Sequence, residues 1–249
     1  ILCCCWLLMK RRYVFLILIL SFFAGLAVAS FAGFKEFLPV LLRGSVVTIK
    51  LTIMAYIVAL VLAFAAGLGK LSPLWSIRWL AIGYIEIFRG TSSLVQLFWI
   101  FFVLPEFGIM LEPMQAGVLA LGLNVGAYGA EVVRAAILAV PREQYEVTTA
   151  LNFSRAMALR RIILPQAIVA MIPTWGNLFI ELLKGTALVS VITLTDLTFA
   201  AYQLNQSVLR TMEIFALALV IYYFMAQISR IATSALEERL GQGLSRGRA

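Results

Sequence analysis

Apolar runs of about twenty residues recur along this sequence, and they constrain its fold more than any other feature. A helix of that length crosses the hydrocarbon core of a bilayer with every backbone hydrogen bond made internally. Only 13% of the residues are charged and 63% are apolar, whereas a soluble domain is about a quarter charged. We therefore predict an all-α, polytopic membrane helix bundle without a separate soluble domain.

Six of the runs are predicted to cross the membrane. They cover residues 13–33, 46–68, 79–104, 114–140, 167–183 and 213–235. Residues 34–44, with Pro39 inside, are predicted to form a short interfacial helix, and residues 187–204 a short helix that does not fully cross. The chain is thus divided into an N-terminal extension (1–36), a transmembrane domain (37–238) and a polar cytoplasmic tail (239–249).

The N-terminal extension leaves two alternatives open. Met9 precedes the basic residues Lys10, Arg11 and Arg12 and resembles a natural start, so residues 1–8 are expected to be an artefact of gene assignment. The apolar run 13–33 is then either a retained helix or a cleaved signal peptide, because AVASFAG at 27–33 supplies the small residues of a cleavage site.

Lys and Arg are unevenly distributed between the two sides that alternating spans define. Positive residues concentrate on the cytoplasmic side of membrane proteins. One side carries Lys10, Arg11, Arg12, Lys70, Arg78, Arg142, Arg155, Arg160, Arg161, Arg230, Arg239, Arg246 and Arg248, and the other carries Lys35, Arg43, Lys184 and Arg210. Both termini and the polar segment 141–166 are therefore predicted to be cytoplasmic.

The polar segment 141–166 has the start and stop signals of a helix–turn–helix. Pro141 suits the first turn of a helix, and Asn152 can end that helix in the left-handed conformation. Ser154 can cap the next helix, which Pro165 would end or kink. The unit is too short and too charged to cross a bilayer, so we expect it to offer a surface to a soluble partner.

Three acid–base pairs are spaced so that their side chains meet on one helix face. They are Glu86/Arg89, Glu131/Arg134 and Glu181/Lys184. The commoner explanation is a self-neutralised pair near a membrane boundary, with the long basic side chain reaching the headgroups. The alternative is a transport pathway, because ionisable groups in spans usually face protein or water, and such a pair could meet both ends of a zwitterionic solute.

Two further polar or small-residue patterns lie inside predicted spans. Gly122 and Gly126 form a GxxxG pattern, which indicates close helix packing either within one subunit or between two. Asn124 lies between them at membrane depth and should find a partner. A polar stripe in the preceding span either lines a pathway or bonds back to its own helix; it consists of Thr91, Ser92, Ser93 and Gln96.

The sequence argues against several kinds of chemistry. It has no His, and its three cysteines, Cys3 to Cys5, are consecutive and lack the spacing of a zinc site. GLGK at 67–70 resembles the end of a phosphate loop, but Phe64 and Leu71 occupy positions that require Gly and Ser or Thr. We therefore expect no catalytic residue, metal or cofactor in this chain, and any ATP must bind another subunit.

Three stretches resemble the polar amino-acid group of membrane permease subunits in bacterial ABC importers. They are residues 85–102, 126–137 and 162–167, and the similarity extends from about residue 38 to residue 238. The family's coupling loop reads Glu-Ala-Ala, three residues, Gly, then Ile-x-Leu-Pro. Here Glu146 is retained, Val147 and Thr148 replace the alanines, Asn152 replaces Gly, and Ile162 to Pro165 is intact.

The resemblance implies a type I importer permease fold and a set of partners. These are an ATPase dimer that holds ATP and magnesium, a second permease of the same or a related chain, and an extracytoplasmic solute-binding protein, all at the bacterial inner membrane. The resemblance implies that the ATPase docks at Glu146, Thr149, Ala150, Asn152, Arg155 and Pro165. The residues proposed for the solute pathway are Glu86, Arg89, Thr91, Asn124, Glu181 and Lys184.

The implied substrate is a small polar amino acid or compatible solute. Residues 120–137 and 181–201 most resemble permeases for ectoine and hydroxyectoine, although permeases for glutamine, arginine, histidine or opines share much of the same sequence. The alternatives are a secondary transporter, which should show paired halves with broken helices, and a membrane scaffold without a pathway. Co-purification with an ATPase would separate the first hypothesis from both.

Overall fold

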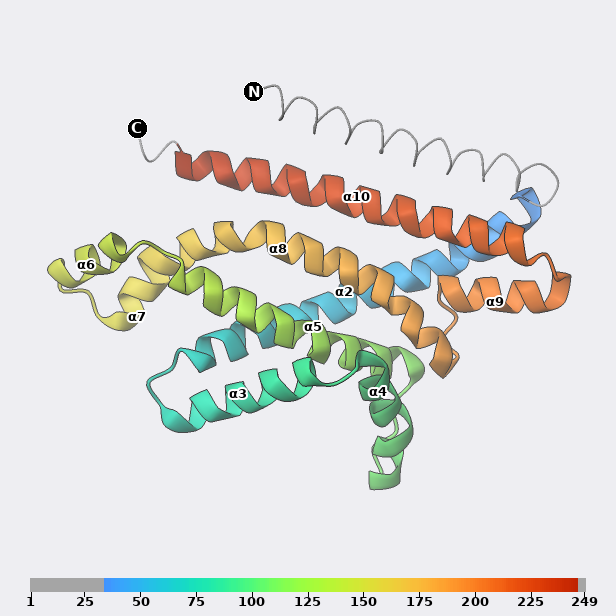
Figure 1. Cartoon of the computed structure of the whole chain (residues 1–249), viewed down its shortest axis with the longest axis horizontal. Coiled ribbons are helices and arrows are strands. Elements are labelled where there is room, and N and C mark those ends of the chain that lie inside the picture. Colours follow the sequence, from blue (N-terminus) through green and yellow to red (C-terminus); the bar gives the residue numbers. More distant parts are fainter. Residues whose placement is uncertain (1–33, 246–249) are drawn as a thin grey trace, which may run out of the picture.

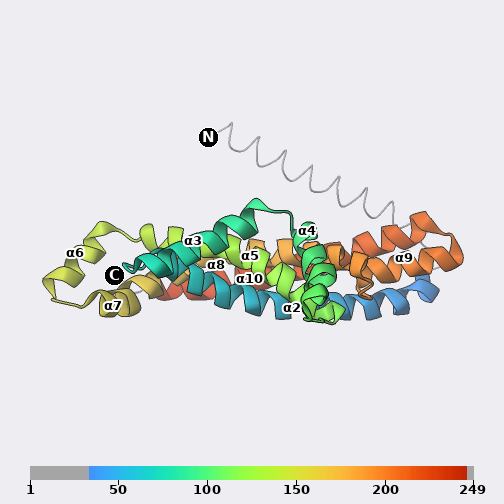
Figure 2. The same ribbon diagram turned by 90° about the horizontal axis from the view of Figure 1, so that it is seen from below.

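The computed structural model describes residues 34–245, and every regular element among them is a helix. The elements form an elongated, flattened bundle (Figures 1 and 2), with α6 and α7 at one end and α9 at the other. The prediction of an all-α membrane bundle is confirmed. The predicted span 13–33, the possible start at Met9 and residues 246–249 lie outside the described residues.

Four continuous stretches of the described chain are long and apolar enough to cross a membrane, and a bent pair of helices makes a fifth span if it is counted as one. The four are Glu36–Lys70, Pro113–Leu138, Arg155–Ile192 and Thr211–Glu237, and the bent pair is Trp75–Gly90 with Ser93–Phe107. This number agrees with the five predicted spans that fall within the described residues.

The centre of the bundle is the long contact between α2 (Phe34–Lys70) and α5 (Pro113–Leu138). Glycines on α5 let the two backbones approach closely. A Cβ on Gly122 would lie 2.9 Å from Val58 Cγ1, and one on Gly126 would lie 3.3 Å from the Ala59 carbonyl oxygen. Both glycines are buried, so the GxxxG pattern packs helices within this subunit.

Helix α2 is continuous from Phe34, and the separate interfacial helix predicted at 34–44 is wrong. Pro39 removes only one backbone hydrogen bond close to the start of the helix, where few such bonds exist. Phe37 and Leu41 on either side of it are buried in a cluster with α9 and α10, which favours continuing the helix through this region.

The predicted single span 79–104 is instead broken into two arms at an angle of 106°. Helix α3 (Trp75–Gly90) ends where Thr91 and Ser92 adopt extended backbone conformations. The second arm consists of α4 (Ser93–Phe98), the π-helix η1 (Trp99–Val103) and the 3₁₀ turn η2 (Leu104–Phe107). Hydropathy alone did not reveal the break, because both arms are apolar.

The helix–turn–helix leads directly into a membrane span. It comprises α6 (Arg142–Ala150), α7 (Arg155–Ala158) and the π-helix η3 (Leu159–Ile163), followed by α8 (Leu164–Gly185). The prediction that Pro165 ends the second helix is wrong, because Arg155–Ile192 is one continuous helical stretch. Pro165 lies at the start of α8, where its missing N–H costs little, and the π turn before it provides room for the ring.

The remaining elements close the bundle at the end opposite α6. The 3₁₀ helix η4 (Thr186–Ile192) is followed by α9 (Leu197–Val208), so residues 187–204 do not cross the bundle, as predicted. Asp196 caps α9 by accepting from the backbone N–H groups of Phe199 (2.8 Å) and Thr198 (3.2 Å). Helix α10 (Thr211–Ser245) returns the chain to the α6 end and continues into the predicted polar tail.

Candidate functional site

The turn between α6 and α7 is a closed, hydrogen-bonded unit. Asn152 has φ 55°, in the left-handed region. Its N–H donates to the Thr149 carbonyl oxygen (3.0 Å), and the N–H of Phe153 donates to that of Thr148 (2.9 Å), which is the bond pattern of a Schellman motif. Ser154 Oγ then accepts from the N–H of Met157 at 3.3 Å. The conformations predicted for Asn152 and Ser154 are both confirmed.

The turn is fixed to the membrane helices on both sides. The Tyr145 hydroxyl donates to the Ile137 carbonyl oxygen of α5 at 2.7 Å, and Gln166 Nε2 of α8 donates to Gln144 Oε1 of α6 at 3.3 Å. Burial raises the pKa of Tyr145, so its hydroxyl stays protonated and keeps donating. Phe153 packs into the same apolar cluster as Ile137. A force on the turn is therefore transmitted to both α5 and α8.

The outer face of this unit exposes apolar side chains. Val147 is 49% exposed, Leu151 57% and Met157 39%. An exposed apolar patch with a polar rim is typical of a protein interaction surface. The residues predicted to contact an ATPase are all exposed here or at the start of α8: Glu146, Thr149, Ala150, Asn152, Arg155 and Pro165. We call the exposed residues between 146 and 157 the tip.

Replacing Asn152 tests whether the tip depends on its backbone conformation. Gly adopts positive φ freely, whereas a β-branched residue at φ 55° pays about 1–2 kcal/mol or more. We expect Asn152→Gly to transport normally and Asn152→Val to lose transport several-fold while gaining sensitivity to protease at the turn. Equal uptake and equal proteolysis in the two variants would show that this conformation is not required.

A second feature is a cleft of about 340 Å³ between the break after α3, α5 and α8. It brings together Thr91, Asn124 and Glu181, three of the six residues predicted for a solute pathway. The Arg89 guanidinium lies 5.3 Å from the ring centroid of Tyr128, which also lines the cleft. Arg89 is therefore at the edge of the cleft.

The other two predicted pathway residues lie elsewhere. Lys184 lines a separate groove of about 320 Å³ between α8 and α10, and Glu86 is exposed without lining either cavity. The structure describes the side chains of residues 36–237. Among them, neither Glu86 with Arg89 nor Glu181 with Lys184 forms an ion pair. The expectation of self-neutralised pairs is wrong for these two, because the partners point to different surroundings.

Hydrogen bonds from two side-chain amides stabilise the break between α3 and α4. Asn124 Nδ2 and Gln96 Nε2 each donate to the Phe88 carbonyl oxygen at 2.9 Å, and Asn124 Nδ2 also donates to Gln96 Oε1 at 3.2 Å. Phe88 is near the end of α3, where carbonyl groups lose their helical partners. Thr91 Oγ1 bonds back to the Ile87 carbonyl oxygen at 2.8 Å. The polar stripe thus stabilises the break and lines the cleft.

Two polar contacts were not anticipated from the sequence. Glu131 pairs with Arg134 at 2.9 Å, as predicted, but also with Lys70 at the end of α2. Fully buried Asp196 accepts from the Tyr222 hydroxyl at 3.3 Å. Both contacts join residues far apart in the chain; the only sequence signal was an acidic group at membrane depth that required some partner.

The fold and these two features define a class: a multi-pass membrane protein with an internal polar cleft and a rigid, exposed helix–turn–helix. The chain belongs to the family of binding-protein-dependent transport system inner membrane components, whose sequence profile matches residues 59–242. Members of this family are permease subunits, and ATP is hydrolysed by separate subunits. The chain is accordingly a permease subunit of a polar amino-acid-type ABC importer, a multi-pass protein of the inner membrane.

Similar proteins include two curated permeases. A probable amino-acid ABC transporter permease of Sinorhizobium fredii is 51% identical over 199 residues, covering 78% of this chain and 84% of that protein. The L-cystine transport system permease of Bacillus subtilis is 37% identical over 207 residues, covering 83% and 88%.

Two solved structures share the fold. The crystal structure of an amino acid ABC transporter with histidines matches with a TM-score of 0.80 and 37% identity, covering 84% of this chain and 98% of that one. An inward-facing methionine ABC transporter matches with a TM-score of 0.70 at 18% identity, covering 81% and 96%.

Proposed function

We propose that this permease moves a small zwitterionic amino acid or compatible solute inward by alternating access, driven by an ATPase dimer that docks on the tip. The observation that supports this most directly is the exposed apolar patch on a unit fixed to both α5 and α8. The proposed assembly adds a second permease, of the same or a related chain, and an extracytoplasmic solute-binding protein. ATP and magnesium are bound by the ATPase.

The tip faces the cytoplasm in this proposal, where ATP is available. In Figure 1, the α2–α3 turn, the tip and the far end of α10 lie at one end of the bundle. That end carries most of the positive residues of the described loops, and positive residues favour the cytoplasmic side. The residues concerned are Lys70 at the end of α2, Arg78 at the start of α3, and Arg142, Arg155, Arg160 and Arg161 of the helix–turn–helix. The opposite end has Arg43 in the first part of α2, Lys184 at the end of α8 and Arg210 just before α10.

Coupling then follows from the connections of the tip. Closure of the ATPase dimer on ATP would move the two tips of a permease pair together. Because α7 continues through η3 into α8, and Tyr145 bonds to α5, such a movement reorients the helices that flank the cleft. The permease is the two-state element, and nucleotide and the loaded binding protein each stabilise one of its states.

The cleft has suitable chemistry for a zwitterion. Glu181 is exposed to the cleft and unpaired among the side chains that the structure describes, so it can meet an ammonium group. Arg89 and the hydroxyl of Ser92 can donate to a carboxylate. Ectoine and hydroxyectoine, the narrower prediction from residues 120–137 and 181–201, are zwitterions too.

Reconstitution tests the proposed function. We expect the chain to co-purify with an ATPase encoded beside it, and proteoliposomes with the binding protein to take up solute only with ATP. Uptake that follows an ion gradient without the ATPase would indicate a secondary transporter, and no uptake with any partner would indicate a scaffold. Calorimetry of the binding protein with ectoine, glutamine, arginine and cystine would identify the solute. The prediction that ectoine is the substrate is wrong if one of the other solutes binds far more tightly.

Replacing Glu181 tests the cleft itself. A hydrogen bond to a charged group contributes about 1.5–3 kcal/mol, so Glu181→Gln should raise the solute concentration for half-maximal uptake about tenfold or more. The matched control is Lys184→Gln, three residues further along α8 but lining the groove on its other side. We expect Lys184→Gln to leave that concentration unchanged. Equal effects of the two substitutions would mean that the cleft does not bind the solute.

A further inference from the structure

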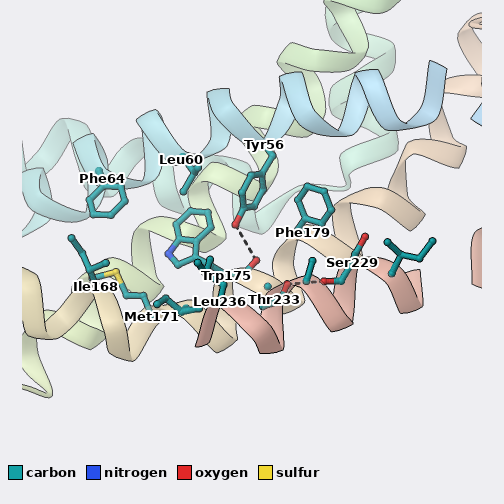
Figure 3. A pocket seen from close by; sticks show the side chains of 14 residues that line it. Tyr56, Leu60, Phe64, Ile168, Met171, Trp175, Phe179, Ser229, Thr233 and Leu236 are labelled. Carbon is teal, nitrogen blue, oxygen red and sulfur yellow. Dashed lines mark hydrogen bonds between the residues drawn. The ribbon is translucent and has the colours of Figure 1, made fainter. Parts of the chain in front are cut away.

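An apolar cavity lies away from the solute cleft and has no role in the function proposed above. It has a volume of about 510 Å³ and lies between α2, α8 and α10. Figure 3 shows side chains from the three helices surrounding it, with Tyr56 and Trp175 on its walls. The labelled lining residues are Tyr56, Leu60, Phe64, Ile168, Met171, Trp175, Phe179, Ser229, Thr233 and Leu236. Small-molecule pockets typically measure roughly 300–1,000 Å³.

The cavity opens toward the lipid. All three of its walls belong to stretches that qualify as membrane spans. Residues at its edge are exposed: Ile168 by 40%, Ile228 by 66% and Leu236 by 51%. Apolar side chains exposed on a membrane span contact hydrocarbon wherever no other helix covers them, so lipid chains can reach this opening.

The few hydroxyl groups of the lining already form hydrogen bonds within the protein. The Tyr56 hydroxyl donates to the Trp175 carbonyl oxygen at 3.2 Å, and Ser229 and Thr233 donate to backbone carbonyl oxygens of their own helix at 2.8 and 2.9 Å. Trp175 Nε1 has no acceptor in the described chain, but neighbouring atoms cover it. The lining therefore selects an apolar occupant, and apolar cavities do not hold water.

One end of the cavity lies near a pair of unpaired cations. Arg161 precedes Ile168 by seven residues across the end of η3 and the first turn of α8, which places it roughly 10 Å nearer the α6 end of the bundle. Arg160 and Arg161 are exposed and form no ion pair within residues 36–237. At the same edge, α10 carries Glu237, Glu238 and Arg239 directly after Leu236. Together with Arg160 and Arg161 these make three positive and two negative residues, so positive charge prevails. The charge complements an anionic headgroup.

We infer that this cavity is a binding site for an anionic membrane phospholipid. One acyl chain fills the space between α2, α8 and α10, and the phosphate lies against Arg160 and Arg161 in the leaflet on the α6 side. Since α8 begins at the helix–turn–helix, this lipid occupies the contact between α8 and α10 directly beneath the tip. The inference requires only that the bundle spans a membrane, and it does not depend on the solute or on the direction of transport.

Photolabelling of the full chain tests this site. The protein would be placed in nanodiscs that contain phosphatidylglycerol with a diazirine near the end of one acyl chain. We expect labelled peptides from residues 168–179 and 228–236 at several times the level of the lipid-exposed face of α2 around Val46 and Val61. The same probe on phosphatidylcholine should label these peptides at least about threefold less, and Arg160→Gln with Arg161→Gln should remove that difference.

A matched pair of substitutions makes the test specific. Ala232 lines the cavity, whereas Ala235 is exposed on the same helix without lining it. Ala232→Phe should reduce labelling at least about fivefold, and Ala235→Phe should not. Labelling equal to that of the α2 face, or unchanged in Ala232→Phe, would overturn the inference. So would labelling that appears only after residues 1–33 are removed, because the N-terminal segment would then be the occupant.

Discussion

Glu146→Lys is expected to lower the rate of ATP-driven uptake more than tenfold, while the permease still folds and reaches the membrane. Glu146 is an exposed carboxylate beside the apolar side chains of Val147 and Leu151, at the position where the family has its Glu. Reversing a charge inside a protein interface costs about 2–5 kcal/mol or more when the partner's charge is left unpaired. The ATPase would therefore hydrolyse ATP without moving the tip.

The measurements are uptake into proteoliposomes and ATP hydrolysis stimulated by the loaded binding protein, both on the assembled complex. Glu237→Lys is the control, because it makes the same charge change at the same end of the bundle but on α10. Gel filtration checks that both variants are folded. Normal uptake by Glu146→Lys, or equal losses in both variants, would exclude a specific coupling role for Glu146.

Gly129→Ala is expected to lower the thermal stability of the permease markedly, although the change adds only one methyl group. A Cβ at this position would lie 2.9 Å from Ala63 Cβ and would overlap the indole ring of Trp175. The ring is buried and packs against both Tyr56 and Gly129, so moving it away from the added methyl group would disturb these contacts. Overpacking of this kind costs about 1–3 kcal/mol.

The control for this change is Gly83→Ala on α3. A Cβ on Gly83 would meet no atom within 4 Å, so the substitution should be neutral or stabilise the helix by up to about 1 kcal/mol. Adding Trp175→Phe to Gly129→Ala removes the ring atoms that overlap and should restore part of the lost stability. If the melting temperatures of Gly129→Ala and Gly83→Ala were the same, the contact between α5 and α8 would not be as described.

Local sequence signals predicted the elements whose boundaries depend on a few neighbouring residues. The apolar runs gave the spans, because crossing a bilayer requires a minimum length of apolar helix. The helix–turn–helix was predicted from Asn152 and Ser154, since a left-handed stop and a side-chain cap are formed within three or four residues. Pro39 and Pro165 misled the prediction, because a proline near a helix start interrupts little.

The two candidate sites also differ in how far the sequence could predict them. The exposed residues of the tip were predictable because they follow one another in sequence and match a family motif. The cleft was only half predicted: Thr91, Asn124 and Glu181 meet in it, whereas Lys184 lies on the opposite side of α8. Spacing along one helix shows which residues are neighbours on that helix, and it carries no information about the helix that packs against them.

By itself, the sequence determined that this chain is a helical membrane bundle with a charged helix–turn–helix at one end, because hydrophobic length, charge and capping act locally. The tertiary structure alone decided three things. These are the 106° break held by Gln96 and Asn124, the pairing of Lys70 with Glu131, and the apolar cavity between α2, α8 and α10. Each depends on groups brought together from distant parts of the chain, and their contact energies arise only once the helices have packed.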